Sequence, residues 1–249
     1  MSKILFVLTA ADHWTLADGT AHPTGFWAEE VVVPYRALEA AGHEITVATP
    51  GGAVPPVDRA SLAAEVNGGQ DRADAFARAL EEMTELRTPV PLAEVDLDDF
   101  AAVFYPGGHG PMEDLAVDAE SGRLLVAALD SGKPLAVVCH GPAALLAAVR
   151  PDGANAFAGY RVAAFTNEEE TQGGLAGQAP WLLQDRLTEA GVDVRAAEPW
   201  APHLVVDRNL ITGQNPASST PVAEELLKRA REDLDRALRR PVQGDVVQP

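Results

Sequence analysis

The sequence has little cysteine, little positive charge and no long hydrophobic run. Its 249 residues include one cysteine, Cys139, which excludes an internal disulfide and a zinc site built from several thiolates. Nineteen Lys and Arg face 37 Asp and Glu, and this formal charge of −18 argues against binding to nucleic-acid phosphates. No apolar run approaches the roughly 18 residues of a membrane helix. We therefore expect no nucleic-acid and no membrane partner.

The apolar run at the N-terminus is short. Residues 4–8, Ile-Leu-Phe-Val-Leu, follow Lys3 and look like the start of a secretion signal. A signal core needs roughly 7–15 apolar residues, and this run stops after five. The run is typical of a buried first strand, so we expect a cytoplasmic protein.

Strand-like and helix-like segments alternate along the chain, which predicts an α/β fold with a mainly parallel sheet and helices on both faces. No linker or repeat divides it, so we expect one domain over residues 1–240 and a flexible tail over 241–249. Apolar runs predict strands at residues 4–8, 44–48, 101–105, 134–138, 160–165 and 192–194, and a hairpin over 204–206 and 210–212.

Proline, glycine and apolar periodicity mark the expected loops and helices. Residues 10–25 and 50–70 have the composition of loops. Pro34 is expected to interrupt a first helix and open a fresh segment that ends at Ala41. Further helices are expected over residues 71–87 (with an apolar stripe at Ala75, Ala79 and Met83), 121–131 and 179–190, and from the cap residue Thr220 onward.

Cys139 stands between an apolar strand and an Ala/Leu-rich stretch that is expected to be helical to Val149. Sites in parallel sheets lie at the carboxyl ends of strands, where residues 107–109 (Gly-Gly-His) are also expected. The unpaired amides and partial positive charge of a helix start stabilise a thiolate. We therefore expect a lowered thiol pKa and a nucleophilic Cys139 rather than an inert buried thiol.

Motifs along most of residues 3–230 resemble those of the ThiJ/PfpI superfamily. Residues 136–143, Ala-Val-Val-Cys-His-Gly-Pro-Ala, are similar to its nucleophile motif. Residues 24–30, Thr-Gly-Phe-Trp-Ala-Glu-Glu, with Pro34-Tyr35, are similar to the first helix of its larger heat-shock-chaperone and glyoxalase III-like branch. Residues 50–52, 57–58, 105–110 and 212–216 also resemble its segments. The resemblance implies a flavodoxin-like fold, related to class I glutamine amidotransferase domains, and a homodimer.

The resemblance implies a Cys-His-acid triad. Cys139 matches the nucleophile and His140 the adjacent base. The acid is expected five residues after Phe165, which is Glu170. Three successive glutamates leave the register open, with Glu168 as the alternative.

Other residues match the surroundings of the triad in the same family. Glu30 matches a helix-borne carboxyl that approaches the thiol, and a protonated carboxyl in a partly buried pocket can shuttle protons. The backbone amides of Gly108 and His140 match the oxyanion hole. His109 and Trp27 are expected to border the substrate pocket, although a structural role for His109 is an equally good interpretation.

No metal site and no cofactor are expected. His13 and His22 lie near carboxylates, but their spacing matches no known ligand pattern and favours an ordinary polar loop. Residues 107–108 are not followed by the glycine series of a dinucleotide site.

The resemblance implies a cofactor-independent glyoxalase that converts methylglyoxal or a related small carbonyl to a hydroxy acid through a Cys139 hemithioacetal. Two alternatives stay open: a stress-response holdase chaperone, and a cysteine hydrolase that is deglycase or peptidase-like. Glutaminase activity is disfavoured because the amidotransferase branch uses a His-x-Glu pair. The only histidine after residue 140 is His203, which Leu204 and Val205 follow.

Overall fold

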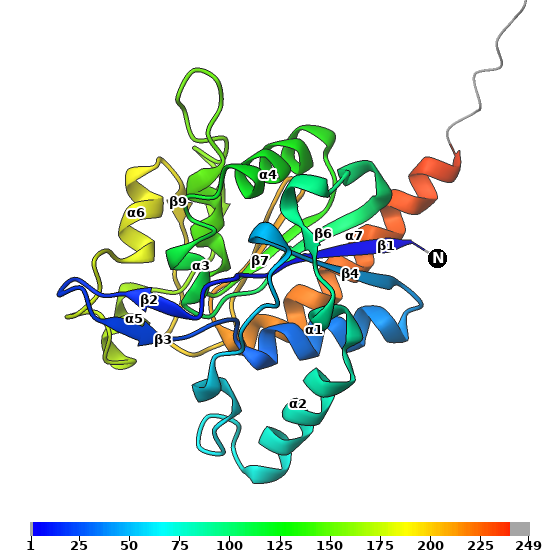
Figure 1. Cartoon of the computed structure of the whole chain (residues 1–249). Coiled ribbons are helices and arrows are strands. Elements are labelled where there is room, and N and C mark those ends of the chain that lie inside the picture. The colour runs from blue at the N-terminus through cyan, green and yellow to red at the C-terminus, as the bar shows by residue number, and fades with distance from the viewer. Residues whose placement is uncertain (1, 240–249) are drawn as a thin grey trace, which may run out of the picture.

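A seven-stranded sheet with the strand order β10-β11-β7-β6-β1-β4-β5 forms the centre of the protein (Figure 1). The computed structural model describes residues 2–239, and side chains up to residue 232, so the expected tail lies outside the described residues. All neighbouring strands are parallel except the edge pair β10 and β11. The strands are β1 (Lys3–Val7), β4 (Glu44–Thr49), β5 (Val90–Pro91), β6 (Phe100–Tyr105), β7 (Leu135–Val138), β10 (Leu204–Asp207) and β11 (Leu210–Gly213).

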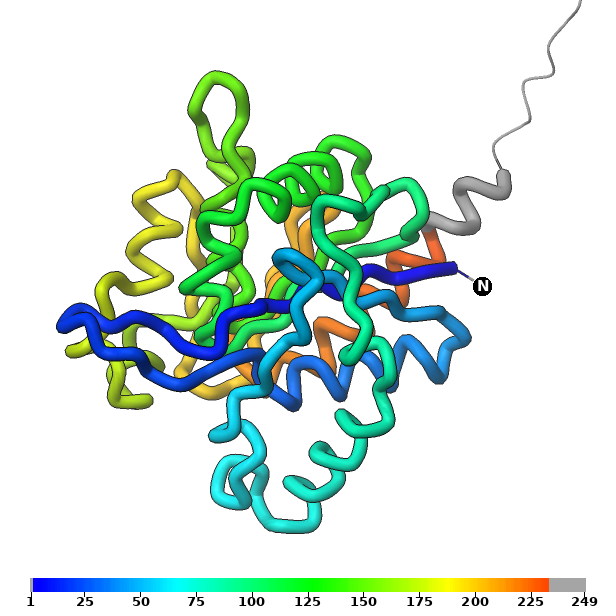
Figure 2. Tube along the Cα trace, viewed as in Figure 1, coloured from blue at the N-terminus to red at the C-terminus, as the bar shows by residue number. Residues whose placement is uncertain are grey.

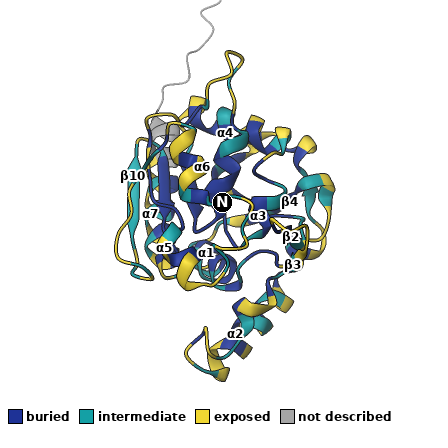
Figure 3. Ribbon diagram, turned by 90° about the vertical axis from the view of Figure 1, so that its left-hand side faces the viewer, coloured by how far each residue is buried: buried dark blue, intermediate teal, exposed yellow. Residues whose placement is uncertain are grey.

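Helices cover both faces of this sheet, which confirms the predicted flavodoxin-like α/β fold. On one face α1 (Ala28–Ala40) packs beside α7 (Ser219–Arg239). On the other lie α3 (Gly110–Glu113), α4 (Ala119–Ser131) and the 3-10 helix η6 (Gly141–Ala147). The helix α2 (Gln70–Glu82) contacts α1 and projects away from the sheet (Figure 3).

The apolar runs of the sequence form the buried centre of the sheet. The last four residues of β1 and all of β7 are buried, because these strands have neighbours on both sides and helices on both faces. β7 lies between β6 and β11. Its carboxyl end therefore opens at the middle of the sheet edge, with Cys139 as the next residue.

Pro34 lies inside α1 and does not divide it, so the expected break is wrong. Proline removes one helical hydrogen bond, to the carbonyl of Glu30. The helix continues because its inner side is packed against the sheet, with Val31, Pro34 and Leu38 all buried. Packing outweighs the local preference here.

The two expected loops contain ordered elements. Residues 10–25 form a hairpin of β2 (His13–Thr15) and β3 (Ala21–Pro23). Figure 2 shows this hairpin beside residues of much higher number, and Ala17 donates a backbone hydrogen bond to Gln178. Residues 50–70 contain the 3-10 turns η1 (Pro50–Gly52) and η2 (Arg59–Leu62).

Several helix and strand boundaries also differ from the prediction. The stripe of α2 buries Ala73, Phe76 and Ala79 and leaves Ala75 exposed. Residues 160–165 form only β8 (Arg161–Val162), which pairs with β9 (Asp193–Val194) outside the main sheet. Other elements are η3 (Thr84–Arg87), η4 (Leu92–Glu94), η5 (Leu97–Asp99), α5 (Asn167–Gln172), α6 (Leu183–Glu189) and η7 (Pro216–Ser218).

The last helix begins one residue before Thr220. The 3-10 turn η7, capped by Asn215, leads directly into Ser219 at the start of α7, so Thr220 is not the cap. The predicted hairpin that precedes it is confirmed as β10 and β11. No helix within the described part of the chain is both long and apolar enough to cross a membrane.

Candidate active site

Cys139 has a left-handed backbone conformation, with φ 60°. Such a conformation is uncommon outside glycine and costs about 1–3 kcal/mol. Hydrogen bonds on both sides hold it: the Cys139 amide donates to the carbonyl of Gly213 at 2.9 Å, and its carbonyl accepts from the amide of Phe165 at 2.9 Å. A strained turn that is fixed from two neighbouring segments is typical of a nucleophile position.

The side chains of Cys139, His140 and Glu170 contact one another in series. Cys139 Sγ lies 3.3 Å from Nδ1 of His140, and Nε2 of His140 lies 2.8 Å from Oε2 of Glu170. When Nε2 carries the hydrogen and donates it to the carboxylate, Nδ1 presents its lone pair to the thiol. Phe165 packs against the His140 ring, with centroids 4.3 Å apart. The structure thus brings together the three residues of the expected triad.

Electrostatics favour a neutral imidazole on His140 and an ionised carboxylate on Glu170. Burial, followed by the nearby His109, lowers the pKa of His140. Burial alone would raise the pKa of Glu170, but His140 and His109 outweigh it and hold that pKa well below its usual value. His140 can therefore accept a proton near neutral pH.

The three successive glutamates have three different environments, since neighbouring residues of a helix point about 100° apart. Glu168 is exposed. Glu169 is buried, forms a capping box with Thr166 and accepts from the backbone amide of Trp200 at 2.8 Å. Glu170 reaches the histidines. The geometry therefore favours Glu170 over the alternative Glu168.

Glu30 reaches the same place from α1. It is fully buried, and its Oε2 accepts from the amide of Gly107 at 2.6 Å. Its Oε1 is buried without a hydrogen-bond partner among the described residues. Burial raises the pKa of Glu30 to about 8, against the lowering influence of Cys139 and Gly107. The carboxyl is thus poised to exchange a proton near neutral pH.

The expected lowering of the Cys139 pKa is wrong for this arrangement. Burial, and then the charge of Glu30, raise the pKa of the thiol well above its usual value, against the lowering influence of the Gly108 amide. The segment that follows is a short 3-10 helix rather than an α-helix with its larger dipole. Two acids this close do not both stay ionised at equilibrium, so the resting pair keeps at least one proton over the neutral range.

Gly107 allows these groups to approach one another. A Cβ at position 107 would lie 2.6 Å from the amide nitrogen of His140, 2.9 Å from Cβ of Cys139 and 2.9 Å from Oε2 of Glu30. Any side chain there would push the three apart. The role of Gly107 was not predicted from the sequence, although the Gly-Gly pair at residues 107–108 is a signal for a close approach of this kind.

Gly108 brings its amide to the sulfur. Its φ is 85°, and a Cβ there would lie 2.2 Å from the carbonyl oxygen of Gly25. This amide lowers the pKa of the Cys139 thiol, so it is a donor placed to support negative charge on sulfur or on an adjacent oxygen. The assignment of Gly108 and His140 as oxyanion donors stays a prediction.

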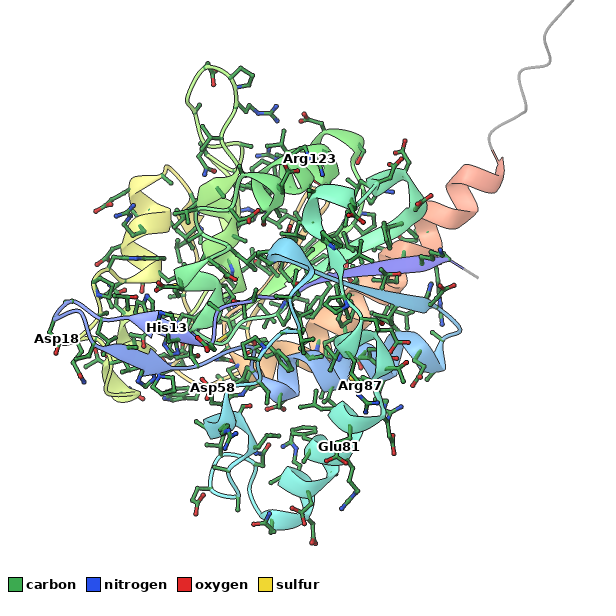
Figure 4. The ribbon with its side chains drawn as sticks, in the orientation of Figure 1. His13, Asp18, Asp58, Glu81, Arg87 and Arg123 are labelled. Atoms are coloured by element: carbon green, nitrogen blue, oxygen red, sulfur yellow. The ribbon has the colours of Figure 1, made fainter. Side chains whose placement is uncertain are left out.

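A cavity of about 700 Å³ opens above Cys139. Trp27 and His109 line it, as expected. His22 lines the cavity, and His13 lies on the β2 strand (Figure 4). Several further residues line the cavity without a local signal in the sequence, among them Arg59, Phe165, Leu175 and Trp200.

Trp200 has a φ of 63°, and no local pattern in the sequence signals it. Its place depends on hydrogen bonds from its backbone amide to Glu169 and from its indole Nε1 to Gln172 at 2.6 Å. Its ring meets Phe165 edge-on at 5.5 Å. These contacts form an aromatic wall that begins at His140.

His109, His140 and Glu170 are the one group, among the residues that the structure describes, with the geometry to hold a metal ion. One ligand atom from each lies within 4.8 Å of the others. These atoms already hydrogen-bond to one another through Glu170. The group differs from the His13 and His22 pair considered from the sequence.

Comparison with known proteins identifies relatives with the same fold. A model of the DJ-1/PfpI family matches residues 22–229. The protein/nucleic acid deglycase HchA of Pseudomonas aeruginosa is 29% identical over 225 residues, covering 87% of this chain and 77% of HchA.

Two solved structures superpose on nearly the whole chain. Rapid Encystment Protein 24 kDa of Francisella tularensis has a TM-score of 0.81 and 27% identity, covering 92% of this chain and 99% of that one. Glyoxalase III from Candida albicans has a TM-score of 0.78 and 24% identity, covering 92% and 97%. The similarity to glyoxalase III shows a shared fold.

Proposed function

This chain belongs to the DJ-1/PfpI family, and we propose that it is a glyoxalase-like enzyme that converts methylglyoxal, or a related small α-oxoaldehyde, to a hydroxy acid. The single observation that carries the proposal is the placement of a thiol between a buried carboxyl and an oriented imidazole. Cys139 couples to Glu30 on one side and to His140 on the other. The route needs only these side chains and water.

The first step joins Cys139 to the aldehyde carbon, C1. His140 takes the thiol proton at Nδ1, the thiolate attacks C1, and the alkoxide that forms takes the proton back from His140. The product is a neutral hemithioacetal. The Gly108 amide, which lowers the pKa of the thiol, supports the negative charge as it passes to oxygen.

The second step isomerises the hemithioacetal to a thioester. A base takes the C1 proton, a proton is added at the neighbouring carbon, C2, and the hydroxyl hydrogen moves from the oxygen on C1 to the oxygen on C2. Glu30 fits the role of base, because its carboxylate is desolvated and its pKa of about 8 matches the task. Hydrolysis of the thioester by water releases the hydroxy acid and restores the thiol.

The proposal is tested by following lactate formation from methylglyoxal. The wild-type protein should produce lactate, and Cys139→Ser and Glu30→Gln should each lose activity by about 100-fold or more. Glu168→Gln is the matched control, because Glu168 is exposed and outside the triad. Undiminished turnover in both site variants would contradict the proposal.

The volume of the cavity favours a second candidate, a deglycase. A cavity of about 700 Å³ is far larger than a three-carbon aldehyde, and its lining includes Trp27, Phe165 and Trp200. A carbonyl adduct of an amino acid side chain would fill more of it. Release of free N-acetylarginine from its methylglyoxal adduct, faster than the adduct decays with Cys139→Ser, would support this candidate, and equal rates would exclude it.

A further inference from the structure

His109 and His140 share one carboxylate. Nε2 of His109 lies 2.9 Å from Oε1 of Glu170, and Nε2 of His140 lies 2.8 Å from Oε2. The two rings are also in contact, with centroids 4.1 Å apart. A Cys-His-acid triad uses one imidazole, so the mechanism above leaves the second without a task.

The ring of His109 is held in a fixed orientation. Trp14, which is buried, stacks on it with centroids 5.2 Å apart and an angle of 18° between the planes. Glu170 holds the Nε2 side. A ring fixed by stacking on its face and by a carboxylate at its edge is preorganised in the way that proton transfer requires.

The other nitrogen of His109 is available. Nδ1 has no hydrogen-bond partner among the described residues, and it is not fully buried. His109 lines the cavity together with Cys139, and its side chain is 14% exposed. Nδ1 is therefore an accessible, unpaired nitrogen on a residue that lines the cavity.

We propose that His109 is a second acid–base residue of this site, which delivers the proton to C2 and sets the configuration of the hydroxy acid. The proposal rests on the proposed function. Glu30 carboxylate takes the C1 proton and becomes the carboxylic acid. His109, protonated from solvent after the attack step, gives its Nδ1 proton to C2 and becomes neutral, while the hydroxyl hydrogen moves from the C1 oxygen to the C2 oxygen. Glu30 then releases its proton to solvent, so both groups return to their starting states. The substrate is thereby isomerised with no net gain or loss of protons.

Glu170 has a part in this step that a simple triad would not give it. Its carboxylate provides the countercharge for whichever imidazole is protonated, His140 in the attack step and His109 in the isomerisation. Because both rings meet the same carboxylate, the two steps use one buried negative charge in turn.

The test uses His109→Gln, because the glutamine amide can reach the position of Nε2 and keep a donor to Glu170 while it cannot transfer a proton. We expect kcat for methylglyoxal to fall by about 100-fold. We also expect the lactate to become a mixture of enantiomers, because solvent then protonates C2 from either side. Reactions in deuterated water with chiral separation of the product give both readouts.

A purely structural His109 predicts a different result. If His109 only holds Glu170, then His109→Gln should keep most of the activity and a single enantiomer, and either an unchanged kcat or an unchanged enantiomer ratio would overturn the proposal. His13→Gln is the matched control, because His13 lies on the β2 hairpin and outside the cavity lining (Figure 4). A thermal melt of each variant confirms folding.

The outcomes also separate this inference from the proposed function. A wild-type protein that forms no lactate overturns both. A wild-type protein that forms one enantiomer, together with a His109→Gln variant that forms the same enantiomer, overturns only the role of His109.

Discussion

The Sγ atom of Cys139 and the Nδ1 atom of His140 lie 3.3 Å apart, although the two residues are neighbours in the chain. In an extended strand adjacent side chains point to opposite faces. The φ of 60° at Cys139 turns the chain, and Glu170 then holds the far side of the imidazole. The strained turn and the base–acid pair therefore act together.

The coupling of Glu30 and Cys139 predicts the pH dependence of the reaction. With both groups protonated the pair is inactive, and loss of the first proton gives the reactive form. Because the pKa of Glu30 is raised to about 8, kcat/KM should rise with pH through about 8. In Glu30→Gln the remaining rate should no longer rise with pH through about 8, because the negative charge of Glu30, which raises the pKa of the Cys139 thiol, is gone. A pH–rate profile unchanged in shape would contradict the coupling.

The same carboxyl should make folding stability depend on pH. A group whose pKa is raised on folding stabilises the protein fully below its unfolded value of 4.5, and this contribution is lost as pH rises toward about 8. At about 1.4 kcal/mol for each pH unit the upper limit is about 5 kcal/mol. Denaturant unfolding should therefore show Glu30→Gln gaining stability relative to wild type between pH 5 and pH 9. A constant difference would contradict a buried, titrating Glu30.

Glu169 should matter for stability and Glu168 should not. Glu169 Oε1 accepts from Trp200, Gln214 and Asn215, and its removal leaves buried donors without partners. Glu169→Ala is expected to lower the free energy of unfolding by about 3 kcal/mol or more. The exposed Glu168→Ala should change it by less than about 1 kcal/mol. Equal effects in urea titrations would mean that the Glu169 network does not hold the Trp200 segment.

The sequence predicted the parts of the site that local patterns encode. The apolar run before Cys139 and the Gly-Gly-His after the preceding strand marked two carboxyl ends of one sheet, and the structure brings them together. The resemblance added Glu30 and Glu170, which lie far away in the chain. Local patterns gave wrong predictions where tertiary packing determines the structure, as in α1, which continues through Pro34, and in the hairpin of residues 13–23.

Other features could not be found from local patterns at all. The shared use of Glu170 by two histidines depends on three segments meeting at one point. The left-handed Trp200 depends on hydrogen bonds to α5, which precedes it by about thirty residues. The raised thiol pKa depends on full burial beside Glu30. Each is a property of the assembled structure rather than of any one segment.

Gly107 provides a steric test of the site. An added methyl group would meet the His140 amide and the Glu30 carboxylate at 2.6 and 2.9 Å, so Gly107→Ala should separate Glu30 from Cys139. We expect activity to fall by at least 10-fold and the free energy of unfolding to fall by about 1–3 kcal/mol. Gly177→Ala is the matched control, because a Cβ at Gly177 meets nothing within 4 Å. Full activity of Gly107→Ala would show that the close approach is dispensable.

The proposed reaction requires the Cys139 thiolate to bond covalently to the carbonyl carbon of the substrate. Rapid acid quench of the protein during turnover of methylglyoxal, followed by peptide mass spectrometry, tests it directly. We expect a transient adduct of one methylglyoxal on the peptide that contains Cys139, which disappears as lactate forms and is absent from Cys139→Ser. Lactate formation at the wild-type rate by Cys139→Ser, with no adduct on that peptide, would contradict it.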